Sequence, residues 1–136
     1  MTSTGRALEA RARFPPESTS PTRARCFAEE TLRGWSCPTM VDDARLLVSE
    51  LVGNAVLHGG SGADLLIMLA EDHVRIEVHD TSMLPVQPRE HVTVLDTAGR
   101  GLMILAALAD SWGVEPDADA RDGKTVWFEL LREVGG

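Results

Sequence analysis

The feature that most constrains the fold is a long amphipathic segment that starts at Pro38-Thr39 and stops at Gly59-Gly60. Apolar residues recur through it every three or four positions, which is the spacing of a helix with one buried face. These residues are Val41, Ala44, Leu47, Val48, Leu51, Val52 and Ala55. Asp42 and Asp43 stand in the first turn, where the helix dipole favours negative charge. Such a helix needs a second layer against which its apolar face can pack.

Strands predicted elsewhere in the chain can supply that layer. Residues 73–79 alternate between apolar and polar side chains, and a turn-like Glu71-Asp72 joins them to the strand before, so the two strands should form a hairpin. Ser20-Pro21 offers an N-cap and a proline for the start of another helix. The other predicted elements are an extended piece at 10–14, a helix at 21–33, strands at 63–70, 111–115 and 125–131, and a short buried helix at 102–109.

Length and composition indicate an ordinary globular protein. The 136 residues are 43% hydrophobic and 25% charged, and we expect one domain over residues 10–132 after a flexible tail at residues 1–9. No apolar run reaches the roughly 18 residues of a membrane-spanning helix and no signal-peptide pattern is visible, so the expected location is the cytoplasm. The formal net charge of -8 repels phosphate backbones and argues against nucleic-acid binding.

Three polar residues of the long helix share one stripe. Glu50, Asn54 and His58 are four residues apart and border the apolar face. A carboxylate and a carboxamide one turn apart suit two tasks: oxygen ligation of a hard cation such as Mg2+, and removal of a proton from water or a hydroxyl. The alternative is a solvated polar edge with no chemical task.

Asp80 stands where a carboxylate is costly. Val74, Ile76 and Val78 share the inward face of the second hairpin strand, and strict alternation puts Asp80 on the same face at the strand's end. A desolvated carboxylate needs a partner, because burial without one is strongly unfavourable. That partner could be an amino group of a ligand or the backbone amides of the following turn.

The segment after Asp80 has the pattern of a functional loop. Residues 81–98 contain two prolines and no hydrophobic period, as is typical of a lid. Gly99-Arg100-Gly101 then leads through Leu102 into an apolar helix, and backbone amides at such a helix start can hold phosphates. The alternative is simply a flexible end of the loop. Thr125, at the head of the last strand, is explained equally well by its β-propensity.

The order of these features resembles that of the GHKL, or Bergerat-fold, ATPases, and especially the small standalone anti-sigma-factor serine/threonine kinases. The resemblance covers about residues 10–132, and its most specific part is the segment ELVGNAVLHGG from Glu50 to Gly60, which looks like the family's N box. It implies an α/β (α+β) two-layer sandwich, with a mixed, mainly antiparallel sheet covered on one face by helices. The implied cofactors are ATP and Mg2+.

The resemblance also implies roles for individual residues. Glu50 resembles the general base that activates the acceptor hydroxyl, and Asn54 resembles the Mg2+ ligand. Asp80 resembles the aspartate that accepts a hydrogen bond from the adenine amino group. Thr125 resembles the threonine that supports this aspartate through water.

The two glycine boxes of the family compare differently with this chain. Gly99 and Gly101, followed by Leu102, look like the second box, whose amides meet the phosphates, and Arg100 is a candidate phosphate contact. The first box has the pattern DxGxG, whereas Asp80 is followed here by Thr-Ser-Met-Leu, with neither glycine. Side chains at those positions would crowd the nucleotide or stiffen the lid.

The resemblance implies a transcription regulator that sequesters a sigma factor and phosphorylates a serine of an antagonist, or anti-anti-sigma, protein. A histidine kinase would need an upstream dimerisation helix with an acceptor histidine, and residues 1–38 are too short and proline-rich to supply it. Related kinases often form homodimers, for which residues 21–33 offer a surface. The missing glycines keep a second hypothesis open, a non-catalytic partner-binding module with a degenerate nucleotide pocket.

Overall fold

The computed structural model describes residues 8–58, 60–80, 103–116 and 123–132. In chain order its elements are β1 (Leu8–Phe14), α1 (Ser20–Gly34), the 3-10 helix η1 (Pro38–Met40), α2 (Val41–Gly53), the π-helical turn η2 (Asn54–His58), β2 (Ala63–Leu69), β3 (His73–Asp80), β4 (Ser111–Pro116) and β5 (Lys124–Leu131). Residues 103–108 form a further helical segment. Strand β1 begins at Leu8, earlier than the expected residue 10.

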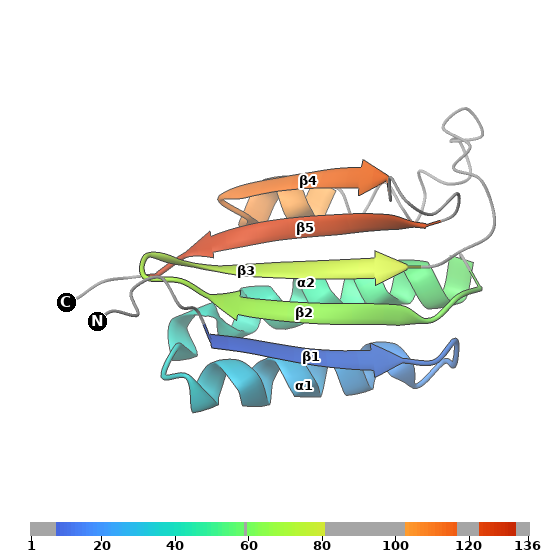
Figure 1. The fold of residues 1–136 in the computed structure, drawn as a ribbon, viewed down its shortest axis with the longest axis horizontal. Coiled ribbons are helices and arrows are strands. Elements are labelled where there is room, and N and C mark those ends of the chain that lie inside the picture. Colours follow the sequence, from blue (N-terminus) through green and yellow to red (C-terminus); the bar gives the residue numbers. More distant parts are fainter. Residues whose placement is uncertain (1–7, 59, 81–102, 117–122, 133–136) are drawn as a thin grey trace.

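The five strands form one sheet in the order β1-β2-β3-β5-β4. Helices α1 and α2 cover one side of this sheet, and the other side, which we call the open face, carries no helix among the described elements (Figure 1). The predicted two-layer sandwich is therefore confirmed. The expectation of a mixed sheet was wrong for the described strands, because every neighbouring pair is antiparallel. Strand β5 lies between β3 and β4, which run in the same direction, and so keeps them from pairing in parallel.

The hydrophobic core lies between the sheet and the helices. Strand β3 alternates strictly between half-buried and buried side chains, as its sequence predicts. The most buried large side chains come from both layers, and they include Leu32, Leu47, Leu65, Ile67, Ile76 and Phe128. The helical segment 103–108 adds the buried Leu105, but its Met103 is 70% exposed, so the expectation of a helix buried on nearly every side was wrong. One face of this segment packs against the core, and the rest is in contact with solvent.

Helix α1 starts differently from the prediction. Ser20 is the first residue of the helix and not its N-cap. Its buried hydroxyl donates a hydrogen bond of 2.6 Å to the carbonyl of Pro15. Pro21 then occupies an early position where its missing N–H costs nothing. The helix packs on α2, and its buried residues include Ala24, Ala28 and Leu32. None of the helices in the described ranges is long and apolar enough to cross a membrane.

Candidate functional site

Helix α2 changes its hydrogen-bonding pattern at Asn54, the predicted metal ligand. The backbone N–H of Asn54 still donates to the carbonyls of Glu50 and Leu51, and the π-helical turn η2 begins there. Short π-helical turns are frequent at functional sites. Glu50 and Asn54, which are one helical turn apart, are both half-buried.

Asp80 is buried at the end of β3, on the face that the helices cover. Its side chain is 6% exposed, and its Oδ2 accepts a hydrogen bond of 2.6 Å from Nζ of Lys124, whose side chain is 34% exposed. The sheet register sets Asp80 directly opposite Lys124. The prediction that this carboxylate points inward is confirmed. Its need for a partner is met in part by a lysine, which neither of the two predicted alternatives included.

Thr125 lies beside Asp80 in the sheet, but its side chain points to the other face. The register pairs Thr125 with His79, and Oγ1 of Thr125 is 3.1 Å from Nδ1 of His79. Successive side chains of a strand point to opposite faces, so Thr125 and His79 lie on the open face, while Lys124 shares the face of Asp80. The water-mediated support of Asp80 by Thr125 stays a prediction.

Gly123 allows the chain to approach the end of β3 closely. Its φ is +106°, a conformation that side chains of other residues rarely allow. A Cβ atom at this position would lie 2.7 Å from the backbone oxygen of Asp80. The glycine therefore places the start of β5, and with it Lys124, against Asp80.

Lys124 was not predicted from the sequence as a site residue, although one signal was present. Lys124 is the only lysine in the sequence, and it stands at the head of a strand next to a glycine. Its contact with Asp80 depends on a register between residues 44 positions apart, which no local pattern reveals. Gly99, Arg100, Gly101 and Leu102, together with the expected lid at 81–98, lie outside the described residues.

The parts of the candidate site lie at one end of the sheet. In Figure 1 the C-terminal end of α2, the end of β3 and the start of β5 are all at the same end, and α2 contacts β3. We call this region, with Asn54, Asp80, Gly123 and Lys124, the Asp80 end. No cluster of three or more metal-binding side chains occurs within the described ranges.

The donor groups at the Asp80 end fit a magnesium nucleotide. Asp80 already accepts a hydrogen bond from the ammonium of Lys124, and an exocyclic amino group of a base also presents N–H donors. Mg2+ bound with a nucleotide keeps several waters and phosphate oxygens as ligands, so it needs few protein groups. The amide oxygen of Asn54 is a suitable one. These residues would hold the base and the metal, respectively.

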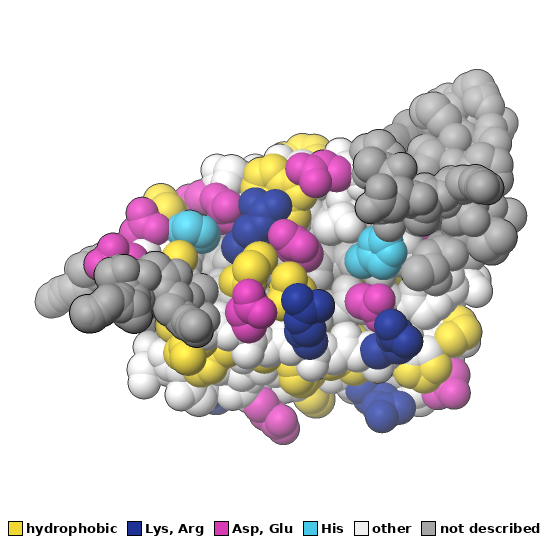
Figure 2. Space-filling model, viewed as in Figure 1, with side chains coloured by type: hydrophobic (Ala, Val, Ile, Leu, Met, Phe, Trp, Pro, Cys, Tyr) yellow, Lys and Arg dark blue, Asp and Glu magenta, His cyan; other side chains and the backbone are white. Residues whose placement is uncertain are grey.

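The open face carries a second polar cluster at the opposite end of β3 and β5. Figure 2 shows this face, where charged side chains, histidines and apolar side chains are mixed over the sheet. Arg75 donates hydrogen bonds to Glu77 (2.8 Å) and Glu129 (3.0 Å), and its guanidinium lies 4.2 Å from the ring centre of Trp127. Burial lowers the pKa of Arg75, but the hydrogen bonds and charges of Glu77 and Glu129 outweigh that effect and raise it.

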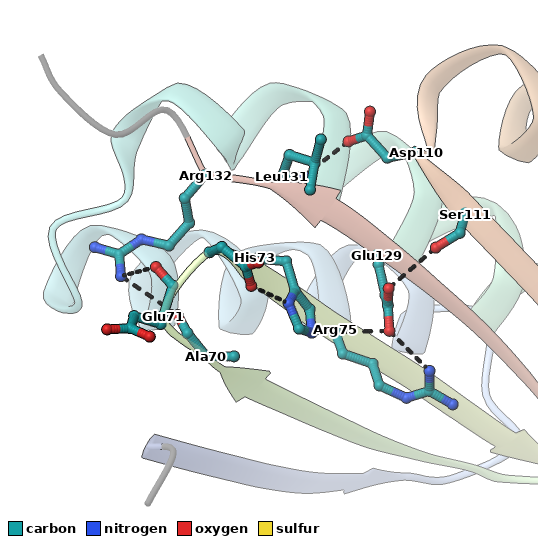
Figure 3. Close-up of polar contacts among 10 residues, drawn as sticks. Ala70, Glu71, His73, Arg75, Asp110, Ser111, Glu129, Leu131 and Arg132 are labelled. Carbon is teal, nitrogen blue, oxygen red and sulfur yellow. Dashed lines mark hydrogen bonds and ion pairs between the residues drawn. The ribbon is translucent and has the colours of Figure 1, made fainter. Parts of the chain in front are cut away.

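The rest of this cluster is drawn in Figure 3. Ser111 donates a hydrogen bond of 3.0 Å to Glu129, and Nε2 of His73 lies 3.7 Å from the same carboxylate. Nδ1 of His73 is 2.8 Å from Asp72, and a hydrogen bond between the two lowers the pKa of Asp72. We call this region the His73 end. Its charges are largely paired with one another.

Comparison with known proteins assigns the chain to a family. The family model described as histidine kinase-like ATPase domain matches residues 14–130, a range that holds the N-box segment, Asp80 and Lys124. A search of the curated proteins found no match. The family match covers most of the sequence and all the residues by which the Asp80 end is defined. The chain therefore belongs to the histidine kinase-like ATPase domain family.

Proposed function

We propose that the protein binds Mg-ATP at the Asp80 end and phosphorylates a serine of an antagonist protein, as a regulatory kinase of the anti-sigma-factor type. The observation that carries this proposal is the carboxylate of Asp80, buried at the end of β3 in a chain that belongs to an ATPase family. A carboxylate in that environment is stable only with hydrogen-bond donors, and the amino group of adenine is such a donor.

Each predicted site residue has one task in this proposal. Asp80 accepts a hydrogen bond from the adenine amino group, with Thr125 as its support, and Asn54 ligates the metal. The amides of Gly99, Gly101 and Leu102, with the side chain of Arg100, hold the phosphates. When bound, Mg-ATP would supply the phosphoryl group and neutralise part of its charge.

Glu50 has the task of a general base. It lies one helical turn before Asn54 and is half-buried, so it stands beside the metal ligand and in contact with solvent. It would take the proton of the acceptor serine hydroxyl as that oxygen attacks. Because phosphoryl transfer depends mainly on positioning and charge, one base on a rigid helix is sufficient.

The proposed partners are a sigma factor and its antagonist. The acidic balance of the chain, with a net charge of -8, favours protein partners over nucleic acid. Helix α1 packs on α2 by only one side, and its other side is the surface that we propose for a homodimer.

Calorimetric titration with ATP and ADP, with and without Mg2+, tests nucleotide binding. We expect Mg2+-dependent ATP binding that is lost in Asp80→Asn and in Asn54→Ala. Asp64→Asn is the matched control, because Asp64 is a more exposed carboxylate of the same sheet, paired with Arg13 on the open face. Equal affinity in Asp80→Asn and the unaltered protein would exclude the proposed site.

A transfer assay tests the role of Glu50. Extract of the source cells is incubated with ATP labelled at the γ-phosphate, and phosphoserine is measured on individual proteins. We expect one protein to be labelled by the unaltered kinase and not by Glu50→Gln, although this variant still binds ATP. Labelling that persists in Glu50→Gln would remove Glu50 from the mechanism.

The second candidate function is a non-catalytic partner-binding module. The contact of Lys124 with Asp80 favours it, because the chain itself partly fills the place of the base. The absence of both first-box glycines after Asp80 favours it as well. No ATP binding at millimolar concentration, in a protein that folds normally, would support this candidate over the kinase.

A further inference from the structure

The contact between Lys124 and Asp80 joins two unequal partners. Asp80 is buried at the end of β3, a strand with neighbours on both sides, so its carboxylate has little freedom to turn toward solvent. Lys124 is one-third exposed, it follows Gly123 in the chain, and its ammonium is carried on a flexible four-carbon stem. The lysine can therefore leave the contact, whereas the aspartate cannot. We therefore expect the two groups to separate by movement of the Lys124 ammonium, while the carboxylate of Asp80 stays in place.

The contact also occupies one oxygen of the carboxylate to which the proposed ligand would bind. The Nζ–Oδ2 distance of 2.6 Å is that of a short, charge-assisted hydrogen bond. A neutral amino group of a base makes a weaker hydrogen bond to the same carboxylate than an ammonium does. A base that took the place of Lys124 on this oxygen would therefore replace a stronger interaction.

We propose that Lys124 determines nucleotide affinity by competing with the amino group of the base for the carboxylate of Asp80. This inference rests on the proposed function, since it concerns the same site. The nucleotide binds when the ammonium moves from Oδ2 of Asp80 toward solvent. Affinity is consequently lower than the rest of the pocket would provide, and any condition that draws Lys124 away from Asp80 raises it.

Substitution of Lys124 tests the competition by calorimetric titration with ATP. Lys124→Met keeps the apolar stem and removes the ammonium, and we expect it to bind ATP roughly tenfold more tightly, an effect of about 1.4 kcal/mol. Lys124→Arg keeps the charge and serves as the matched control, for which we expect no gain in affinity. Lys124→Gln gives a second neutral variant should Lys124→Met fold poorly. Unchanged or weaker binding in the folded neutral variants would overturn the proposal.

A direct observation of the lysine is possible because it is the only one in the sequence. Reductive methylation with 13C-formaldehyde labels Lys124 and the terminal amine, so the NMR spectrum holds one side-chain signal. We expect this signal to move when Asp80→Asn is introduced, and to move in the same direction when ATP saturates the unaltered protein. A signal that does not move at saturation would show that Lys124 stays on Asp80, contrary to the proposal.

The outcomes separate this inference from the proposed function. If the unaltered protein binds ATP, Asp80→Asn does not, and Lys124→Met binds no better, only the role of Lys124 fails. If the unaltered protein does not bind ATP but Lys124→Met does, the competition is supported and the site is confirmed as a nucleotide site. If neither binds, both proposals fail.

Discussion

The two ends of the β3–β5 pair differ in how their carboxylates are buried and paired. At the Asp80 end, a buried carboxylate on the helix-covered face accepts a hydrogen bond from the partly exposed ammonium of Lys124. At the His73 end, Glu129 lies on the open face and contacts Arg75, Ser111 and His73, with its side chain 27% exposed. Several partners and solvent share the charge at the His73 end, so no ligand is needed there. A buried charge with a displaceable partner is the better location for recognition.

The largest expected effect comes from Gly123→Ala at the Asp80 end. The new Cβ would lie 2.7 Å from the backbone oxygen of Asp80, at a φ of +106° that alanine rarely adopts. We expect a loss of about 2 kcal/mol or more in the free energy of unfolding, measured by urea denaturation, because neither backbone segment can easily move.

Gly113→Ala is the control for this prediction. Its Cβ would also lie 2.7 Å from a neighbouring atom, but that atom is Nε1 in the side chain of Trp127. A side chain can shift where a backbone cannot, and Gly113 has no positive φ. We expect a smaller loss of stability than in Gly123→Ala. Equal losses in the two variants would show that the close approach at the Asp80 end has no special cost.

A smaller effect is expected from Glu129→Gln at the His73 end. Arg75 keeps its hydrogen bond of 2.8 Å to Glu77 and its contact with the ring of Trp127. We therefore expect a loss of about 1 kcal/mol or less in the free energy of unfolding. A loss well above that value would mean that the His73 end depends mainly on the charge of Glu129.

The smallest effect is a pH dependence at Asp72. The hydrogen bond with His73 lowers the pKa of Asp72 below its ordinary value of 3.8. A carboxyl group with a lowered pKa in the folded state stabilises that state above pH 3.8, and this contribution is lost as the pH falls through the folded pKa. We expect Asp72→Asn to have a slightly lower urea midpoint at neutral pH and to converge with the unaltered protein in acid. If the difference in urea midpoint between the two proteins stayed constant with pH, ionised Asp72 would not be its cause.

Local patterns predicted the elements well, because their signals lie within each element. The period of three to four residues located α2, and the period of two put Asp80 on the inward face of β3. The π-helical turn at Asn54 was missed, since the helical spacing of apolar residues continues through it. The insertion of β5 between β3 and β4 has no local signal either, and it is this pairing that brings Lys124 to Asp80.

The position of β5 in the sheet also has a consequence for folding. Strands β2 and β3 are joined by a short turn, but β3 and β5 meet only after a long loop has closed, with Asp80 and Lys124 separated by 44 positions. Closing a longer loop costs more chain entropy, and contacts of large sequence separation form slowly. The Asp80 end is therefore expected to be among the last parts of the molecule to assemble. Before β5 joins the sheet, Asp80 would therefore stand at the end of β3 without Lys124 opposite it.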